Sequence, residues 1–323
     1  MCSPNHTTIG HFIALVLVLV LGCATGPEDD GRREKVEPPS DRATSHIEIT
    51  DTFGHVVKLE KPAERIASLA PGFTEILFAI GCNDRIRVRD NWSNFPADAA
   101  ALPAVDGLEP SPAIIAGYDP DLVLLCFRDA RSLKSFDQIG LPVAMMEPKT
   151  FAQVAEDIAK LGVLCGREER AREVAAKMLR VKDEVSLALK KTDYRPAVYV
   201  ELDGADPARP WTAGPGSFID ELLALAGARN VASDAGSSYA QVSAESIIRS
   251  DPDVVLLLGS KNIDPATAVE MIGKRPGWSQ ISAIKQGRVI SGLDRDLLSR
   301  PGPRLAEGLT LLHRALHPDG ESK

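Results

Sequence analysis

Apolar residues along this chain form short continuous runs that alternate with stretches of helical periodicity. The run Ile66–Leu69 is followed by a Pro-Gly turn and by a helical pattern over Phe73–Ile80. The same order returns in Val198–Glu201 and Phe218–Ala226. Short buried strands that alternate with helices at this spacing favour parallel sheets covered by helices on both faces.

The sequence repeats this plan once. Glu75 lies six residues before Gly81, and Glu221 lies six residues before Gly227. A second match follows each of these, YDPDLVLL (Tyr118–Leu125) in the first half and SDPDVVLLL in the second. One match could be chance, but two in the same order indicate two similar lobes.

Hydrophobic patterning predicts the remaining elements as well. They are a β-hairpin over His46–Leu59, strands near Ile86–Val88, at Leu122–Leu125, Pro142–Met145, Val254–Leu258 and Val289–Ile290, and helices at Pro112–Ala116, Ala130–Ile139, Ala244–Arg249, Ala266–Ile272 and Pro303–Leu316.

The segment Arg167–Lys191 lies between the repeats and contains neither glycine nor proline. Its apolar residues recur at helical spacing. A helix of its 25 residues would be about 37 Å long at 1.5 Å per residue. That is longer than a crossover inside one lobe needs, so we interpret it as a rigid spacer that joins the lobes.

These patterns predict an α/β protein with two similar Rossmann-like lobes that hold a ligand cleft between them. A chain of 323 residues exceeds what one hydrophobic core usually serves. We place the N-terminal lobe with its leading hairpin at 46–166, the interlobe helix at 167–191 and the C-terminal lobe at 192–318.

The N-terminus is separate from this fold. Phe12–Leu21 holds ten apolar residues, too few to span a bilayer but typical of a signal-peptide core. It ends at Gly22-Cys23, which resembles a bacterial lipobox in which the cysteine is lipidated. The alternative is a plain secretory signal with an incidental cysteine, and the leader Met1–His11 lacks the usual Lys or Arg, which a misplaced start codon could explain.

We therefore predict a lipoprotein signal peptide at 1–22 and a lipidated cysteine with a flexible tether at 23–45. The tether has one large apolar residue, Val36, and cannot bury enough surface to fold. The protein would then be exported and anchored by lipid to a bacterial membrane.

Composition and charge narrow the function. The chain has 44% hydrophobic and 25% charged residues and a net charge of −8, which is ordinary for a globular protein and argues against a nucleic-acid partner. Cys82, Cys126 and Cys165 match no zinc pattern, so at most one disulfide forms among them.

Enzyme signatures are absent from the sequence, which contains no nucleophile elbow, P-loop or H-E-x-x-H motif. His313 and His317 have metal-ligand spacing on the last helix, but no third ligand accompanies them. We expect no catalytic residue, no metal and no resident cofactor.

Candidate ligand contacts occur where strands end. In open parallel sheets ligands bind outside the carboxyl ends of the strands, and two lobes would turn those ends toward one another. The residues there are Pro71, Gly72, Phe73, Trp92 and Arg128 in the first lobe, and Trp211, Tyr239, Asp294, Asp296 and Arg300 in the second.

Aromatic residues make up only 5% of the chain, yet Trp92, Trp211 and Tyr239 all fall in predicted loops. Large flat side chains with a few charges suit a bulky, flat, partly polar ligand. The alternative for each ring is that it caps the core of its own lobe.

Several segments together resemble the periplasmic-binding-protein family that serves ABC importers of cobalamin, haem and iron–siderophores. They are RIASLAPGFTEILFAIGCNDRI, SNFP, DPDLVLL, the long helix, WTAGPGSFIDELLALAG, AQVSAESIIRSDPDVVLL and SRPGPRLAEGL. The resemblance spans about 64–318 and is greatest with the vitamin B12-binding branch, through Trp92 in WSNFP, Tyr239 before Q-V-S, and Asp296 and Arg300 in the last loop.

This resemblance implies a monomer that binds a corrinoid between lobes and closes only slightly. It also implies docking onto a permease dimer through one acid on each lobe, for which Glu75 and Glu221 are the candidates. Haem and siderophore proteins share the scaffold, so those ligands stay open. An enzyme built on the same lobes around a cofactor, or a tethered adhesin without a small ligand, are the competing classes.

Overall fold

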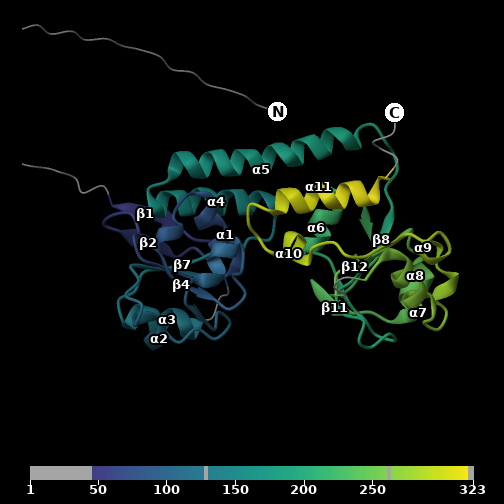
Figure 1. The fold of residues 1–323 in the computed structure, drawn as a ribbon, viewed down its shortest axis with the longest axis horizontal. Helices are drawn as coiled ribbons and strands as arrows, with labels where there is room; N and C mark the ends of the chain where they lie inside the picture. The colour runs from purple at the N-terminus through teal and green to yellow at the C-terminus, as the bar shows by residue number, and fades with distance from the viewer. Residues whose placement is uncertain (1–45, 127–129, 260–262, 319–323) are drawn as a thin grey trace, which may run out of the picture. The chain divides into compact units, whose positions relative to one another are not determined.

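Two parallel sheets, one in each lobe, form the framework of the protein (Figure 1). The computed structural model describes residues 46–126, 130–259 and 263–318, and these residues belong to one compact unit. The predicted signal peptide, lipidated Cys23 and tether lie outside the described residues, as does Arg128.

The N-terminal sheet has five parallel strands. In spatial order they are β5 (Ala104–Val105), β4 (Ile86–Asp90), β3 (Ile66–Ser68), β6 (Leu122–Leu125) and β7 (Val143–Met145). Every residue of β3, β6 and β7 is buried. Leu122 and Leu124 belong to one hydrophobic cluster whereas Val123 and Leu125 belong to another, so both faces of the sheet are covered.

An antiparallel hairpin precedes this sheet, as predicted, and consists of β1 (Ile47–Thr50) and β2 (Val56–Leu59). The helices of the lobe are α1 (Pro71–Ala79), α2 (Pro112–Ala116), α3 (Ala130–Gln138) and α4 (Phe151–Cys165), with short 3-10 turns at η1 (Asn83–Arg85) and η2 (Ala97–Ala101). α1 begins with proline at its first position, where the missing N–H costs nothing.

The C-terminal sheet has four parallel strands. They run β10 (Arg229–Asn230), β8 (Ala197–Glu201), β12 (Val254–Leu257) and β13 (Val289–Ile290). The strands of the two repeated motifs are sheet neighbours in both lobes, with Ile66 opposite Leu122 in one and Val198 opposite Val254 in the other. The predicted duplication of lobes is confirmed.

The C-terminal lobe also contains a second antiparallel pair, β9 (Trp211–Ala213) with β11 (Tyr239–Gln241). Its helices are α6 (Phe218–Leu225), α7 (Ala244–Ser250), α8 (Pro265–Gly273), α9 (Ser282–Lys285), α10 (Arg295–Ser299) and α11 (Leu305–Leu316), with a 3-10 turn at η3 (Trp278–Gln280). The sequence did not predict β9 and β11 as strands.

The connection between the lobes is α5 (Glu168–Leu189), a helix of 22 residues. Arg167 and Lys190, which the sequence placed inside the helix, are its capping residues. Ala171, Ala175, Met178 and Val185 form its buried face. Among the described residues, no helix is both long enough and apolar enough to cross a membrane.

α4 was not predicted from the sequence, yet it packs along α5 (Figure 1). Thr150 caps its start by accepting a hydrogen bond from the Gln153 amide at 3.1 Å, and Gly166 ends it with a φ of 58°. Gly162 allows the close crossing, because a Cβ there would lie 2.4 Å from the Ala171 Cβ.

One continuous hydrophobic cluster runs through both lobes. It includes Leu124 from the first sheet, Met178 from α5, Leu256 from the second sheet and Leu309 from α11. α5 therefore joins the lobes by lying on a shared core rather than as an isolated spacer.

Candidate functional site

A cavity of about 200 Å³ lies where the strand ends of the N-terminal lobe meet the loop after α10. Five of the predicted ligand contacts line it, namely Pro71, Gly72, Phe73, Trp92 and Arg300. Because Arg300 comes from the C-terminal lobe, both lobes contribute to this cavity, as a ligand site between lobes requires.

Gly72 and Pro301 bring the two lobes together beside this cavity. A Cβ at position 72 would lie only 2.2 Å from the Pro301 carbonyl oxygen, so glycine is needed for the approach. Phe73 is 3% exposed and belongs to the hydrophobic core, so most of its surface serves packing.

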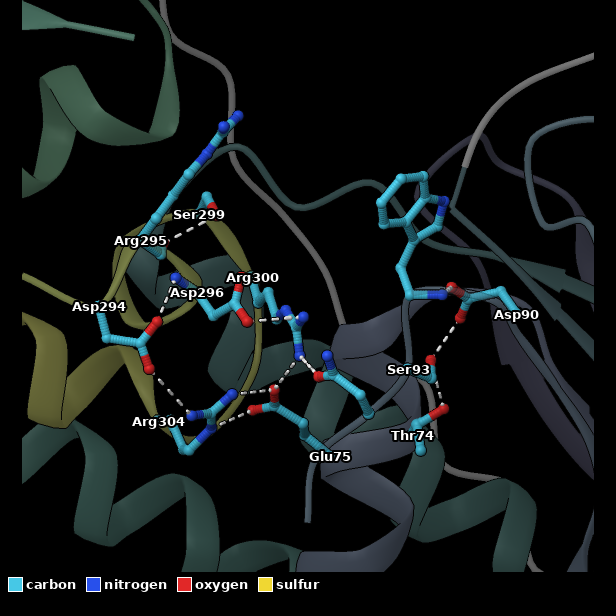
Figure 2. Close-up of polar contacts among 12 residues, drawn as sticks. Thr74, Glu75, Asp90, Ser93, Asp294, Arg295, Asp296, Ser299, Arg300 and Arg304 are labelled. Carbon is cyan, nitrogen blue, oxygen red and sulfur yellow. Dashed lines mark hydrogen bonds and ion pairs between the residues drawn. The ribbon is translucent and has the colours of Figure 1, made fainter. Parts of the chain in front are cut away.

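Trp92 is held in place by its backbone, yet the residue stays 62% exposed. The Asp90 carboxylate, at the end of β4, accepts hydrogen bonds from the Trp92 amide at 2.7 Å and from the Ser93 hydroxyl. The Thr74 hydroxyl donates to the Ser93 Oγ at 3.0 Å (Figure 2). Asp90, Ser93 and Thr74 are buried, so this series of hydrogen bonds fixes the turn that carries Trp92.

Arg300 is the charged group of the cavity. Its Nη1 donates to the Asn94 Oδ1 at 2.8 Å, and its Nη2 lies 2.7 Å from the Asp296 Oδ2. Asp294 caps α10 by accepting from the Asp296 amide at 2.9 Å. The predicted grouping of acid and arginine in the last loop is thus present, and Asn94 is a partner that the sequence did not indicate.

Glu75 lies inside the protein rather than on its surface. It is 4% exposed, and Arg304 binds both of its oxygens, with Nε to Oε2 at 3.0 Å and Nη2 to Oε1 at 2.6 Å. Figure 2 shows Glu75 between Arg304 and Arg300, whose Nη1 lies 3.7 Å from Oε1.

The prediction that Glu75 docks onto a permease is therefore wrong in its premise, because a buried carboxylate with a bidentate partner offers no surface to another protein. Burial lowers the pKa of Arg304, but the hydrogen bonds and charge of Glu75 outweigh this and raise it overall. Arg304 also stacks over the Phe95 ring at 3.6 Å.

Glu221 is half-buried at the seam between α6 and α4. Its Oε2 accepts a hydrogen bond of 2.6 Å from the amide of Phe151, the first residue of α4. Burial raises the pKa of Glu221, although the Phe151 amide and the charge of Lys182 oppose this. A docking role for Glu221 stays a prediction.

The aromatic contacts predicted in the C-terminal lobe stand on the β9–β11 pair, where Trp211 is 44% exposed and Tyr239 54% exposed. Trp211 lines a second cavity of about 730 Å³ at the carboxyl end of β8. Arg295, Met271 and Asp203 also line it, whereas Tyr239 lines neither this cavity nor the first.

A buried ion pair forms one wall of this second cavity. Glu201 is 3% exposed, and both of its oxygens bind the Arg275 guanidinium, one of them at 2.9 Å. Burial, followed by the Glu201 charge, raises the pKa of Tyr199, whose hydroxyl donates to the Glu201 Oε2 at 3.4 Å. Sequence reasoning missed this pair, although Glu201 closes a predicted strand.

The two histidines of the last helix contact each other and a backbone carbonyl oxygen. His313 and His317 stack at 4.8 Å, and a ring nitrogen of each lies within 3.2 Å of the Ala226 carbonyl oxygen. No group of three or more His, Cys, Asp or Glu side chains in the described part of the chain could hold a metal. Cys82, Cys126 and Cys165 are free thiols.

Comparison with known proteins agrees with this architecture. The family described as periplasmic binding protein matches residues 66–295. An uncharacterized ABC transporter substrate-binding lipoprotein of Bacillus subtilis is 28% identical over 96% of this chain and 97% of its own length. A cobalamin-binding protein of Halobacterium salinarum is 28% identical over 95% of this chain and 85% of its own.

A solved structure gives a third comparison. The periplasmic haem-binding protein RhuT of Roseiflexus sp. RS-1, in apo form, superimposes with a TM-score of 0.69. It is 26% identical to this chain, and the match covers 80% of this chain and 100% of the RhuT chain. RhuT thus shares the fold of this chain, while the names of RhuT and of the Halobacterium relative point to different ligands.

Proposed function

Because the chain belongs to the periplasmic binding protein family, we propose that it captures a corrinoid, such as cobalamin, and delivers it to the permease of an ABC importer. The observation that carries this proposal is the cavity lined by Trp92 from one lobe and Arg300 from the other. The family is one of solute-binding proteins rather than enzymes, which supports a non-enzymatic role.

The exposed aromatic rings favour a large flat ligand. Trp92, Trp211 and Tyr239 are all exposed in the free protein, and a ligand that covers them would remove apolar surface from water. Arg300 lines the same cavity as Trp92, and Asp296 is its ion-pair partner, so polar groups lie beside one of the rings, which suits the amide-rich rim of a corrinoid. The name of the Halobacterium relative points to the same ligand class.

The sequence before the described residues supports capture of the ligand at a membrane. Lipidation of Cys23 would anchor the chain, and the tether to residue 45 would let the lobes reach a permease. The Bacillus relative carries the word lipoprotein in its name. We propose that Cys23→Ser leaves the protein soluble or retained as a precursor, as membrane fractionation would measure; unchanged partition would remove lipidation as the anchor.

Haem or an iron–siderophore is the alternative ligand, supported by the fold shared with a haem-binding protein. Calorimetric titration of the mature chain, carrying Cys23→Ser, with cyanocobalamin, haem and a ferric siderophore separates the candidates. We expect cyanocobalamin to bind most tightly with one molecule per chain. Tighter binding of haem or siderophore would reassign the ligand, and no binding of any of the three would overturn the proposal.

A further inference from the structure

Glu75 and Glu221 occupy matched places in the repeat, and each reaches out of its own lobe. Glu75, on α1 of the N-terminal lobe, binds Arg304 in the segment before α11. Glu221, on α6 of the C-terminal lobe, binds the amide of Phe151, which follows the last strand of the N-terminal sheet. We propose that these two carboxylates are reciprocal ties that fix the separation of the lobes and so pre-form the cavity lined by Trp92 and Arg300, which is one part of the ligand site.

The Glu75 tie is the stronger of the two. Its carboxylate is buried, and the planar guanidinium of Arg304 meets it in a bidentate fork, which fixes orientation as well as distance. Phe95, from the same lobe as Glu75, covers the other side of Arg304. The N-terminal lobe therefore grips one C-terminal-lobe side chain from two directions.

This tie is connected to the cavity through neighbouring residues. Arg300 lies four residues before Arg304 in the sequence. Its Nη1 lies 3.7 Å from the Glu75 Oε1 and donates a hydrogen bond of 2.8 Å to the Asn94 Oδ1. On the other side, Thr74 joins α1 to the turn that carries Trp92 (Figure 2). The position of α1 relative to Arg304 thus sets how far Arg300 lies from Trp92.

The Glu221 tie acts at a different point of the same seam. Its single hydrogen bond satisfies one of the orphan amides at the start of α4, and a carboxylate there is favoured by the helix dipole. It is half-buried and has no bidentate partner, so we expect it to contribute less than Glu75.

Such ties would let a ligand bind without first bringing the lobes together. A site that is already assembled avoids the ordering cost of assembly, which raises affinity through the association rate. Loss of the ties should leave the chemistry of the cavity intact while its two halves spread over a wider range of separations.

The direct test needs no ligand, so it stands even if the proposed corrinoid ligand is wrong. The chain is first made cysteine-free, and single cysteines are then introduced at Lys134 in the N-terminal lobe and at Lys274 in the C-terminal lobe. Spin labels on these two cysteines report the distance between the lobes. We expect a narrow distance distribution in the parent chain and a broader one in Glu75→Gln, with a smaller broadening in Glu221→Gln. The matched control is Glu307→Gln, an exposed glutamate on α11, which should behave as the parent does.

A distribution in Glu75→Gln that is as narrow as that of the parent overturns the proposal. Should Glu75→Gln fail to fold, Glu75→Gln with Arg304→Met removes both charges of the pair at similar volume, a replacement that proteins often tolerate. This double variant should fold and still show the broader distribution; a parental distribution in it would also overturn the proposal.

The ligand arm rests on the proposed function. With cyanocobalamin as the probe, Glu75→Gln should bind about tenfold more weakly, with most of the loss in the association rate. A loss confined to the dissociation rate would instead indicate a lost ligand contact and overturn the role as a tie. Absence of cyanocobalamin binding to the parent chain would count against the proposed function alone.

Discussion

The two lobes share one repeated plan but differ in the chemistry at the carboxyl ends of their strands. In the N-terminal lobe, Asp90 is satisfied by neutral donors, the Ser93 hydroxyl and the Trp92 amide. In the C-terminal lobe, Glu201 is satisfied by the charged fork of Arg275. Both lobes thus keep buried parallel strands, whose packing tolerates little change, while the carboxylates at two of their strand ends are held by different kinds of partner.

The largest expected difference between the lobes concerns the buried ion pair. Arg275→Met leaves the Glu201 carboxylate buried without a counter-charge and should lower the free energy of unfolding by about 3–5 kcal/mol. The matched control is Lys274→Met, which breaks the exposed Lys274–Glu270 pair and should cost about 0–1 kcal/mol. Chemical denaturation measures both, and equal losses would show that Glu201 does not depend on Arg275.

A smaller loss of stability is expected when a glycine at the contact between the lobes is replaced by alanine. Gly72→Ala places a methyl group 2.2 Å from the Pro301 carbonyl oxygen, where the lobes approach each other. We expect a loss of about 1–3 kcal/mol in unfolding free energy, as for other overpacked sites. Gly236→Ala, in the C-terminal lobe, meets nothing within 4 Å and should be nearly neutral. A stabilised Gly72→Ala, as helix propensity alone would give, would contradict the close approach.

The lobes should also respond to pH in opposite directions. Burial raises the pKa of Asp157 on α4 to about 7, despite the nearby charge of Lys160. Below pH 4 the carboxyl is protonated in both states; between pH 4 and 7 only the folded state holds the proton, so stability falls as pH rises. Asp157→Asn should remove this slope, as chemical denaturation across pH 4–7 would measure.

His317 on the C-terminal lobe should make stability depend on pH in the opposite direction from Asp157. Burial, followed by the charge of His313, lowers the pKa of His317, so the unfolded state binds a proton more readily below about pH 6.5. Stability should therefore be full above that pH and fall as pH drops below it. Melting temperatures of His317→Asn across pH 5–8 test this, and a slope identical to that of the parent would assign the effect to another group.

The repeat made most of the fold predictable. Hydrophobic runs such as Ile66–Leu69 and Val198–Glu201 mark strands whose pairing follows from the parallel architecture. The rule that ligands bind beyond the carboxyl ends of strands led to Trp92 and Arg300, which share a cavity.

The ion pairs could not be predicted in the same way. Glu75 and Arg304 are 229 residues apart in sequence, and nothing local to Glu75 indicates that its side chain faces the other lobe. A carboxylate near a helix start is equally compatible with an exposed dipole contact. α4 was missed because Gly162 weakens its helical pattern, and the need for that glycine appears only when α5 packs beside it.

Calorimetric titration of Trp92→Ala with cyanocobalamin tests most directly the claim that a corrinoid binds between the lobes. Trp92 should contribute about 1–3 kcal/mol as a buried aromatic contact in the complex, so the variant should bind about 10–100-fold more weakly than the parent chain. Leu187→Ala, which alters an exposed apolar residue on α5, should bind as the parent does. Equal affinities of Trp92→Ala and the parent, or no binding by the parent, would contradict the account.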